Sequence, residues 1–144
     1  MSYLLDTCSI SEMVAAQPNK SVLKWFERQA EENLYLSVIT VGEISNGIYQ
    51  LAIGKRRLQL EIWLKDVLQP TFRGRILNID GDLMTTWAKM VADFKNKGLI
   101  RPSFDSLIEA TALRHNLILV TRNVKNFRGS PVTVLNPWEI GEIQ

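Results

Sequence analysis

The chain has 144 residues, of which 17 are basic, 15 are acidic and 46% are hydrophobic, with a formal net charge of +2. These values predict one packed domain over residues 1–144 and exclude both a disordered tail and a strongly basic nucleic-acid-binding protein. No apolar run approaches the roughly 20 residues of a membrane span, and no basic segment with a long apolar stretch opens the chain. These features predict that the protein has no membrane span. Cys8 is the one cysteine of the chain, so no internal disulfide can form. A chain without disulfides suits the reducing cytoplasm, where we expect the protein to act.

Short apolar runs alternate with segments of helical periodicity. In chain order, the pattern predicts a strand at 3–5, a helix at 20–30, a strand at 34–38, helices at 41–53 and 56–68, a strand at 75–79, helices at 82–96 and 103–115, and strands at 117–121 and 132–135. Strands separated by helices indicate crossover connections. The predicted fold class is therefore α/β, with a central parallel sheet flanked by helices.

Oxygen-bearing side chains are predicted to gather at one edge of this sheet. Asp6 ends the first strand, Glu43 is placed in the first turn of the helix after the second strand, and Asp105 is placed in the first turn of a later helix. Asn123 follows the strand that contains the segment "LILV". Because ligands of open α/β sheets bind at the carboxyl ends of the strands, these four residues form a candidate site.

The residue types at this edge favour a hard cation. Carboxylates held close together repel one another unless a cation lies between them. Oxygen ligands without His or Cys suit Mg²⁺ or Mn²⁺ better than Zn²⁺. Asp6, Glu43 and Asp105 are therefore the candidate metal ligands, and a bound cation could activate water for attack on a phosphate.

Each residue also has a structural interpretation. Asp6 could cap the next helix, Thr40 and Glu43 have the spacing of a capping box, and Asp105 could favour a helix dipole. Asn123 could be a turn residue.

Other polar residues are assigned to structure. We interpret Asp80 and Asp82 as helix caps, and Asp93 as part of a solvated helix face. His115 is expected at a helix end, where its positive form is stabilised, and Cys8 is expected to be packed near the site.

Four segments resemble a known family. "LLDTCSI", "SVITVGEI", "SFDSLIEATALRHNLILVTRNVKNF" and "VTVLNPWE" are similar to PIN domains, and more narrowly to the VapC toxins of toxin–antitoxin pairs, including their FitB-like branch. The resemblance extends from residue 3 to about residue 139. It implies a parallel α/β sheet and an Mg²⁺- or Mn²⁺-dependent endoribonuclease.

The resemblance also assigns roles. The family's acidic positions match Asp6, Glu43 and Asp105, and its fourth acidic position falls on Asn123, which leaves the number of metal ions open. Thr121 matches a polar residue that supports the site, so the implied catalytic set is Asp6, Glu43, Asp105, Asn123 and Thr121. The implied partners are an RNA substrate such as transfer RNA, a VapB-like antitoxin, a second copy of the chain, and promoter DNA through the antitoxin.

Two other functions are considered. The protein could belong to a complex whose main role is promoter DNA binding, although the chain has no helix-turn-helix signature or strong basic patch. It could also be a phosphoryl-transfer hydrolase with Asp6 as nucleophile. Such enzymes usually have a second acid two residues later, and Cys8 occupies that position.

Overall fold

The structure is a computed structural model, and it describes residues 1–140. Its strands are β1 (Tyr3–Leu5), β2 (Leu34–Ser37), β3 (Ile76–Leu77), β4 (Ile118–Val120) and β5 (Val134–Leu135). Its α-helices are α1 (Thr7–Glu12), α2 (Lys20–Glu27), α3 (Val38–Tyr49), α4 (Lys55–Trp63), α5 (Gln69–Thr71), α6 (Gly81–Asn96), α7 (Ser103–Arg114) and α8 (Pro137–Ile140). A π-helical segment, η2 (Leu64–Leu68), joins α4 to α5, and η1 (Glu31–Asn33) and η3 (Val124–Phe127) are 3₁₀ turns.

The predicted parallel sheet is confirmed. Its five strands are in the order β3-β2-β1-β4-β5, and every neighbouring pair is parallel. The chain builds outward from β1 to β2 and β3 on one side and later adds β4 and β5 on the other. The direction of winding therefore reverses between β1 and β4, where this class of fold leaves room for a ligand.

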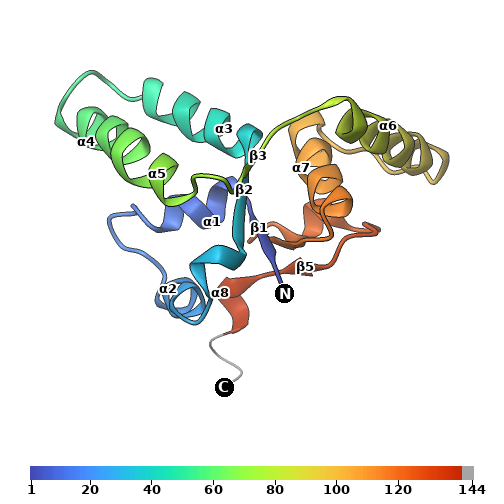
Figure 1. Cartoon of the computed structure of the whole chain (residues 1–144), viewed down its shortest axis with the longest axis horizontal. Helices are drawn as coiled ribbons and strands as arrows, with labels where there is room; N and C mark the ends of the chain where they lie inside the picture. The colour runs from blue at the N-terminus through green and yellow to red at the C-terminus, as the bar shows by residue number, and fades with distance from the viewer. Residues whose placement is uncertain (141–144) are drawn as a thin grey trace.

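Helices cover both faces of the sheet (Figure 1). Helices α1 to α5 lie on one face, and α6 and α7 lie on the other. Consecutive residues of β1 point to opposite faces, so that Leu5 packs with Trp25 and Ile44 while Leu4 packs with Ile108. Burial on both sides explains why β1 is a continuous apolar run.

Several predicted boundaries differ from the structure. Helix α3 begins at Val38 rather than at 41, because β2 runs into it without a loop and Ser37 accepts a hydrogen bond from the Ile39 N–H at 3.0 Å. The alternative interpretation of Thr40 and Glu43 as a capping box is therefore wrong: Ser37 is the cap, and the buried Thr40 hydroxyl has no hydrogen-bond partner within residues 1–140. Helix α1 was not predicted, because six residues are too short to show periodicity.

The structural interpretations of several polar residues are confirmed. Asp80 caps α6 by accepting from the Leu83 N–H at 2.8 Å, and exposed Asp93 pairs with Lys97. His115 lies at the C-terminal end of α7. Asp82 is not a cap; it lies in the first turn of α6, where it pairs with Arg114. Within residues 1–140, no helix combines the length and apolar character needed to cross a bilayer.

Candidate functional site

Asp6 lies where β1 meets β4. Its backbone N–H donates to the Val120 carbonyl at 3.1 Å, which continues the pairing of the two strands. Its carboxylate accepts a hydrogen bond from the Ser9 N–H at 3.0 Å and so caps α1. Only 8% of the residue is exposed. Asp6 is thus both a helix cap and a buried carboxylate at the carboxyl edge of the sheet.

Two further side chains hold the Asp6 carboxylate in place. Cys8 Sγ lies 2.9 and 3.1 Å from its two oxygens, and Ser9 Oγ lies 3.0 Å from Oδ1. Burial, the Asp6 charge and the Asp6 hydrogen bond together raise the pKa of the Cys8 thiol from 9.0 to about 11. Cys8 therefore keeps its proton at physiological pH, and its S–H group donates a hydrogen bond to the Asp6 carboxylate.

Asp105 lies in the first turn of α7, as predicted. Burial raises the pKa of its carboxyl group, the Asp6 charge raises it further, and the Arg101 guanidinium acts in the opposite direction. Asp6 and Asp105 are therefore near enough to repel each other, although they are far apart in sequence. The structure brings together the first strand's aspartate and the first turn of α7.

Glu43 is placed differently from the prediction. Because α3 begins at Val38, Glu43 lies in the second turn of the helix and gains little from its dipole. The Thr7 hydroxyl donates to Glu43 Oε1 at 2.7 Å. Thr7 directly follows Asp6, so Glu43 is tied to the loop that contains Asp6.

A pocket of about 760 Å³ opens beside Glu43. Thr7 and Glu43 line it together with Phe104, which is 55% exposed and directly precedes Asp105. An open, mostly apolar hollow next to Glu43 leaves room for part of a ligand to lie beside it.

The side chains after β4 differ in burial. Thr121 is fully buried, and its hydroxyl accepts a hydrogen bond from the Asn123 N–H at 3.0 Å and lies 3.8 Å from Cys8 Sγ. This arrangement suits a supporting residue rather than one that contacts a substrate. Asn123 is exposed, and within residues 1–140 its side chain makes no hydrogen bond.

The donor set can be tested against a divalent cation. Within residues 1–140, no group of three or more His, Cys, Asp or Glu side chains is arranged to hold a metal ion. Asp6 and Asp105 do form a pair of mutually repelling carboxylates, which a hard cation would neutralise. By charge and donor type this pair fits Mg²⁺ or Mn²⁺, and Glu43 is held next to it by Thr7.

A buried ion pair beneath Asp105 was not predicted. Glu109 is fully buried one helical turn after Asp105, and its Oε1 lies 3.0 Å from Nε of Arg101, which is 5% exposed. The guanidinium also lies 4.7 Å from the centre of the Phe94 ring. A charged residue on the otherwise apolar face of α7, next to Ile108 and Ala112, is the sequence signal that could have indicated this pair.

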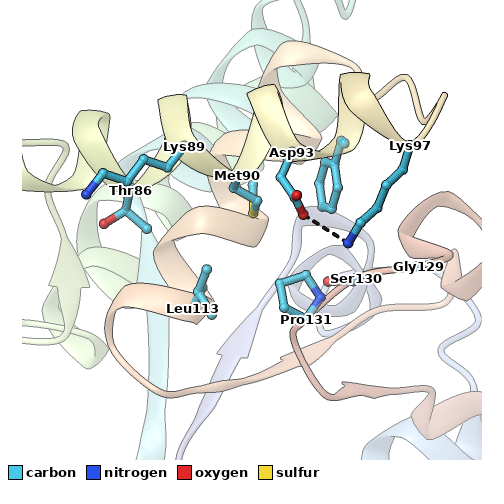
Figure 2. Close-up of a pocket in the computed structure, with 10 residues that line it drawn as sticks. Thr86, Lys89, Met90, Asp93, Lys97, Leu113, Gly129, Ser130 and Pro131 are labelled. Atoms are coloured by element: carbon cyan, nitrogen blue, oxygen red, sulfur yellow. Dashed lines mark ion pairs between the residues drawn. The ribbon is translucent and has the colours of Figure 1, made fainter.

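A second pocket, of about 490 Å³, lies away from these carboxylates (Figure 2). Met90 and Leu113 from α6 and α7 face Pro131 across it, and the Asp93–Lys97 ion pair lies at its rim. None of the predicted site residues lines this pocket.

Residues 3–128 match the family model described as "PIN domain". The chain belongs to the PIN-domain family. This PIN domain is 37% identical to VapC ribonuclease Y4jK of Sinorhizobium fredii over 136 residues, which cover 94% of this chain and 97% of the relative. It is 38% identical to toxin FitB of Neisseria gonorrhoeae over 135 residues, with coverages of 94% and 97%.

Solved structures agree with this assignment. The PIN domain superposes on a chain of FitAB bound to a DNA fragment with a TM-score of 0.91, 36% identity and 96% coverage of both chains. A chain of the FitAcB structure from Neisseria gonorrhoeae also gives a TM-score of 0.91, with 37% identity and coverages of 96% and 99%. The predicted resemblance to PIN domains of the VapC and FitB type is therefore confirmed.

Proposed function

We propose that this PIN domain is a divalent-cation-dependent endoribonuclease and the toxin of a toxin–antitoxin pair, acting on RNA in the cytoplasm. The observation that carries the proposal is the position of Asp6 at the carboxyl end of β1, beside β4, where the winding of the sheet reverses, together with the repulsion between Asp6 and Asp105 in the first turn of α7. Two buried or half-buried carboxylates that repel each other are costly to a fold unless they serve a ligand. The relative named VapC ribonuclease supplies the class of reaction.

Each residue of the site has a proposed role. Asp6 and Asp105 would hold a Mg²⁺ or Mn²⁺ ion, and Glu43 would supply a third carboxylate near the ion. When bound, the cation supplies Lewis acidity toward phosphate and water. Cys8 and Ser9 orient Asp6, Thr7 orients Glu43, and Thr121 shapes the loop that carries Asn123.

Asn123 distinguishes this site from one with four carboxylates. Its amide oxygen accepts and its amide nitrogen donates, so it can orient a water molecule or a phosphate oxygen. It adds no negative charge, which favours one cation in the absence of RNA. Replacing it by aspartate (Asn123→Asp) should tighten Mn²⁺ binding in a calorimetric titration.

Cleavage of RNA by the purified protein tests the reaction. Activity should need Mg²⁺ or Mn²⁺ and stop with EDTA, and Asp6→Asn or Asp105→Asn should abolish it. Asp82→Asn is the matched control, because Asp82 is exposed and pairs with Arg114 outside the site. Since water is the proposed nucleophile, the products should carry 5′-phosphate and 3′-hydroxyl ends, and 2′,3′-cyclic phosphate ends would contradict the proposal.

We also propose that a VapB-like antitoxin silences the activity and that the toxin forms homodimers within the complex. The exposed apolar side chains Leu58, Ile62 and Val67, each more than half exposed, support a partner surface along α4 and η2. Helix α2 offers less to a partner, because its apolar residues Val22 and Trp25 are buried within the domain.

Promoter binding is the second candidate function. The FitAB structure with a DNA fragment, from a relative 36% identical to this chain, is the observation that favours it. The antitoxin would then read the DNA, and this chain would contribute to the assembly. Growth arrest that requires Asp105 would favour the ribonuclease, whereas toxicity unaffected by Asp105→Asn would favour the regulatory role.

A further inference from the structure

An arginine that follows β4 lies over the ring of a tryptophan in α8. The guanidinium carbon of Arg122 lies 5.6 Å from the centre of the Trp138 ring. The Trp138 N–H donates to Asn136 Oδ1 at 2.9 Å, and the preceding Pro137 carbonyl accepts from Ser21 Oγ at 2.8 Å. The indole is thus anchored through its backbone, and it orients the guanidinium above it.

The Cys8 side chain connects the backbone of Arg122 to Asp6 of the candidate site. The Arg122 N–H donates to Cys8 Sγ at 3.4 Å, and the same sulfur contacts both oxygens of Asp6. Arg122 is therefore joined through Cys8 to the Asp6 carboxylate.

The charge of Arg122 has no acidic partner within residues 1–140. Other arginines form ion pairs with acidic partners: Arg57 with Glu61, Arg75 with Glu31, Arg101 with Glu109 and Arg114 with Asp82. Arg122 is exposed and forms no ion pair within residues 1–140.

The surrounding sequence reinforces this charge. Residues 110–138 contain four Lys or Arg residues and no Asp or Glu. Two of the four, Lys125 and Arg128, are exposed and also lack an acidic partner among the described residues. A free positive charge beside carboxylates favours the approach of a polyanion, because the carboxylates repel phosphate.

We propose that Arg122, oriented by Trp138, binds a phosphate of single-stranded RNA next to the bond that is cut. This contact rests on the proposed ribonuclease function and specifies the form of its substrate. An unpaired base can stack on the exposed guanidinium plane, whereas the bases of a duplex are already stacked on each other. Arg122 is the binding residue, and Trp138 is a positioning residue that acts through it.

Salt-dependent binding tests the contact. The full chain with Asp105→Asn is titrated against a short fluorescent unpaired RNA and against the same RNA as a duplex, at several salt concentrations. Adding Arg122→Ala should lower the slope of log K against log salt by about 0.7, the value for one phosphate on a single strand. Lys65→Ala, an exposed charge on η2, is the matched control and should leave the slope unchanged.

Substitutions at Trp138 separate positioning from packing. Trp138→Phe keeps an aromatic ring and should retain most of the affinity. Trp138→Leu should weaken binding several-fold, while circular dichroism reports an unchanged fold. In a background with an intact Asp105, Arg122→Ala should raise KM by about tenfold or more, as loss of a charged hydrogen bond predicts, with a smaller change in kcat.

The outcomes distinguish this contact from the proposed activity. Cleavage by the unmodified protein together with an unchanged salt slope for Arg122→Ala would overturn the contact and leave the ribonuclease standing. Arg122-dependent RNA binding without cleavage under any divalent cation would overturn the ribonuclease and support the contact. Equal affinity for the duplex would overturn the assignment to single-stranded RNA.

Discussion

The carboxylate of Asp6 caps α1 and also lies close to Asp105. Asp6 can be both a helix cap and a candidate metal ligand. One of its oxygens accepts the hydrogen bonds of the cap, while the negative charge remains at the edge of the sheet. Cys8 and Ser9 fix the orientation of that carboxylate. In the absence of a cation, the Asp6 charge and burial disfavour the ionised form of Asp105 and so raise its pKa.

Replacing Asp105 by asparagine should therefore stabilise the cation-free protein. Its carboxylate is disfavoured in the fold, so Asp105→Asn should raise the free energy of unfolding at pH 7 by less than about 1 kcal/mol, since the group is partly screened by solvent. The gain should shrink as pH falls and vanish below the ordinary pKa of 3.8. Urea denaturation in EDTA at several pH values measures this, and a loss of stability at pH 7 would contradict it.

The reactivity of Cys8 gives a second prediction. With its pKa raised from 9.0 to about 11, the thiol should react with an aromatic disulfide reagent about 100-fold more slowly at pH 8 than in the urea-unfolded chain. Cys8→Ser, which keeps a donor to Asp6, should preserve RNA cleavage better than Cys8→Ala does. Equal thiol reactivity in the folded and unfolded chains would show that Asp6 and burial do not protect the sulfur.

At the scale of elements, α7 positions both charged residues of its first two turns. Asp105 is close enough to feel the charge of Asp6, and Glu109, one turn later, pairs with Arg101 in the connection from α6. Topology made Asp105 predictable, because a helix that leads into a parallel strand begins at the carboxyl edge. The Arg101–Glu109 pair was not predictable in this way, because its partners are joined by a tertiary contact and not by a repeated spacing.

Breaking this ion pair should destabilise α7 strongly. Glu109→Ala leaves a buried guanidinium without its partner and should cost about 3–5 kcal/mol. The double variant Arg101→Met with Glu109→Leu removes both charges and should recover most of that loss. A double-mutant cycle in urea measures the coupling, and additive losses would show that the two charges do not stabilise each other.

At the scale of the whole molecule, the reversal of strand order decides where the site lies. The alternating pattern of runs was sufficient to predict a parallel sheet, and with it the positions of Asp6 at the end of β1 and of Asp105 in the first turn of α7. The position of Glu43 was misjudged by one helical turn, because β2 passes into α3 without the turn residues that mark a boundary. The short α1 and the side chains that hold Asp6 depend on packing between distant segments, which periodicity does not report.

The exposed apolar side chains of α4 yield the last prediction. Leu58 and Ile62 are 57% and 51% exposed, and burying them against an antitoxin or a second copy would release water from a continuous surface. Leu58→Glu with Ile62→Glu should leave the melting temperature nearly unchanged, because neither side chain is in the core. The same variant should separate the protein from its co-expressed genomic neighbour, or convert a dimer to a monomer, in size-exclusion chromatography with light scattering. Met84→Glu, an exposed apolar position on α6, is the matched control. Complexes of unchanged size and affinity in the α4 variant would exclude this helix from the interface.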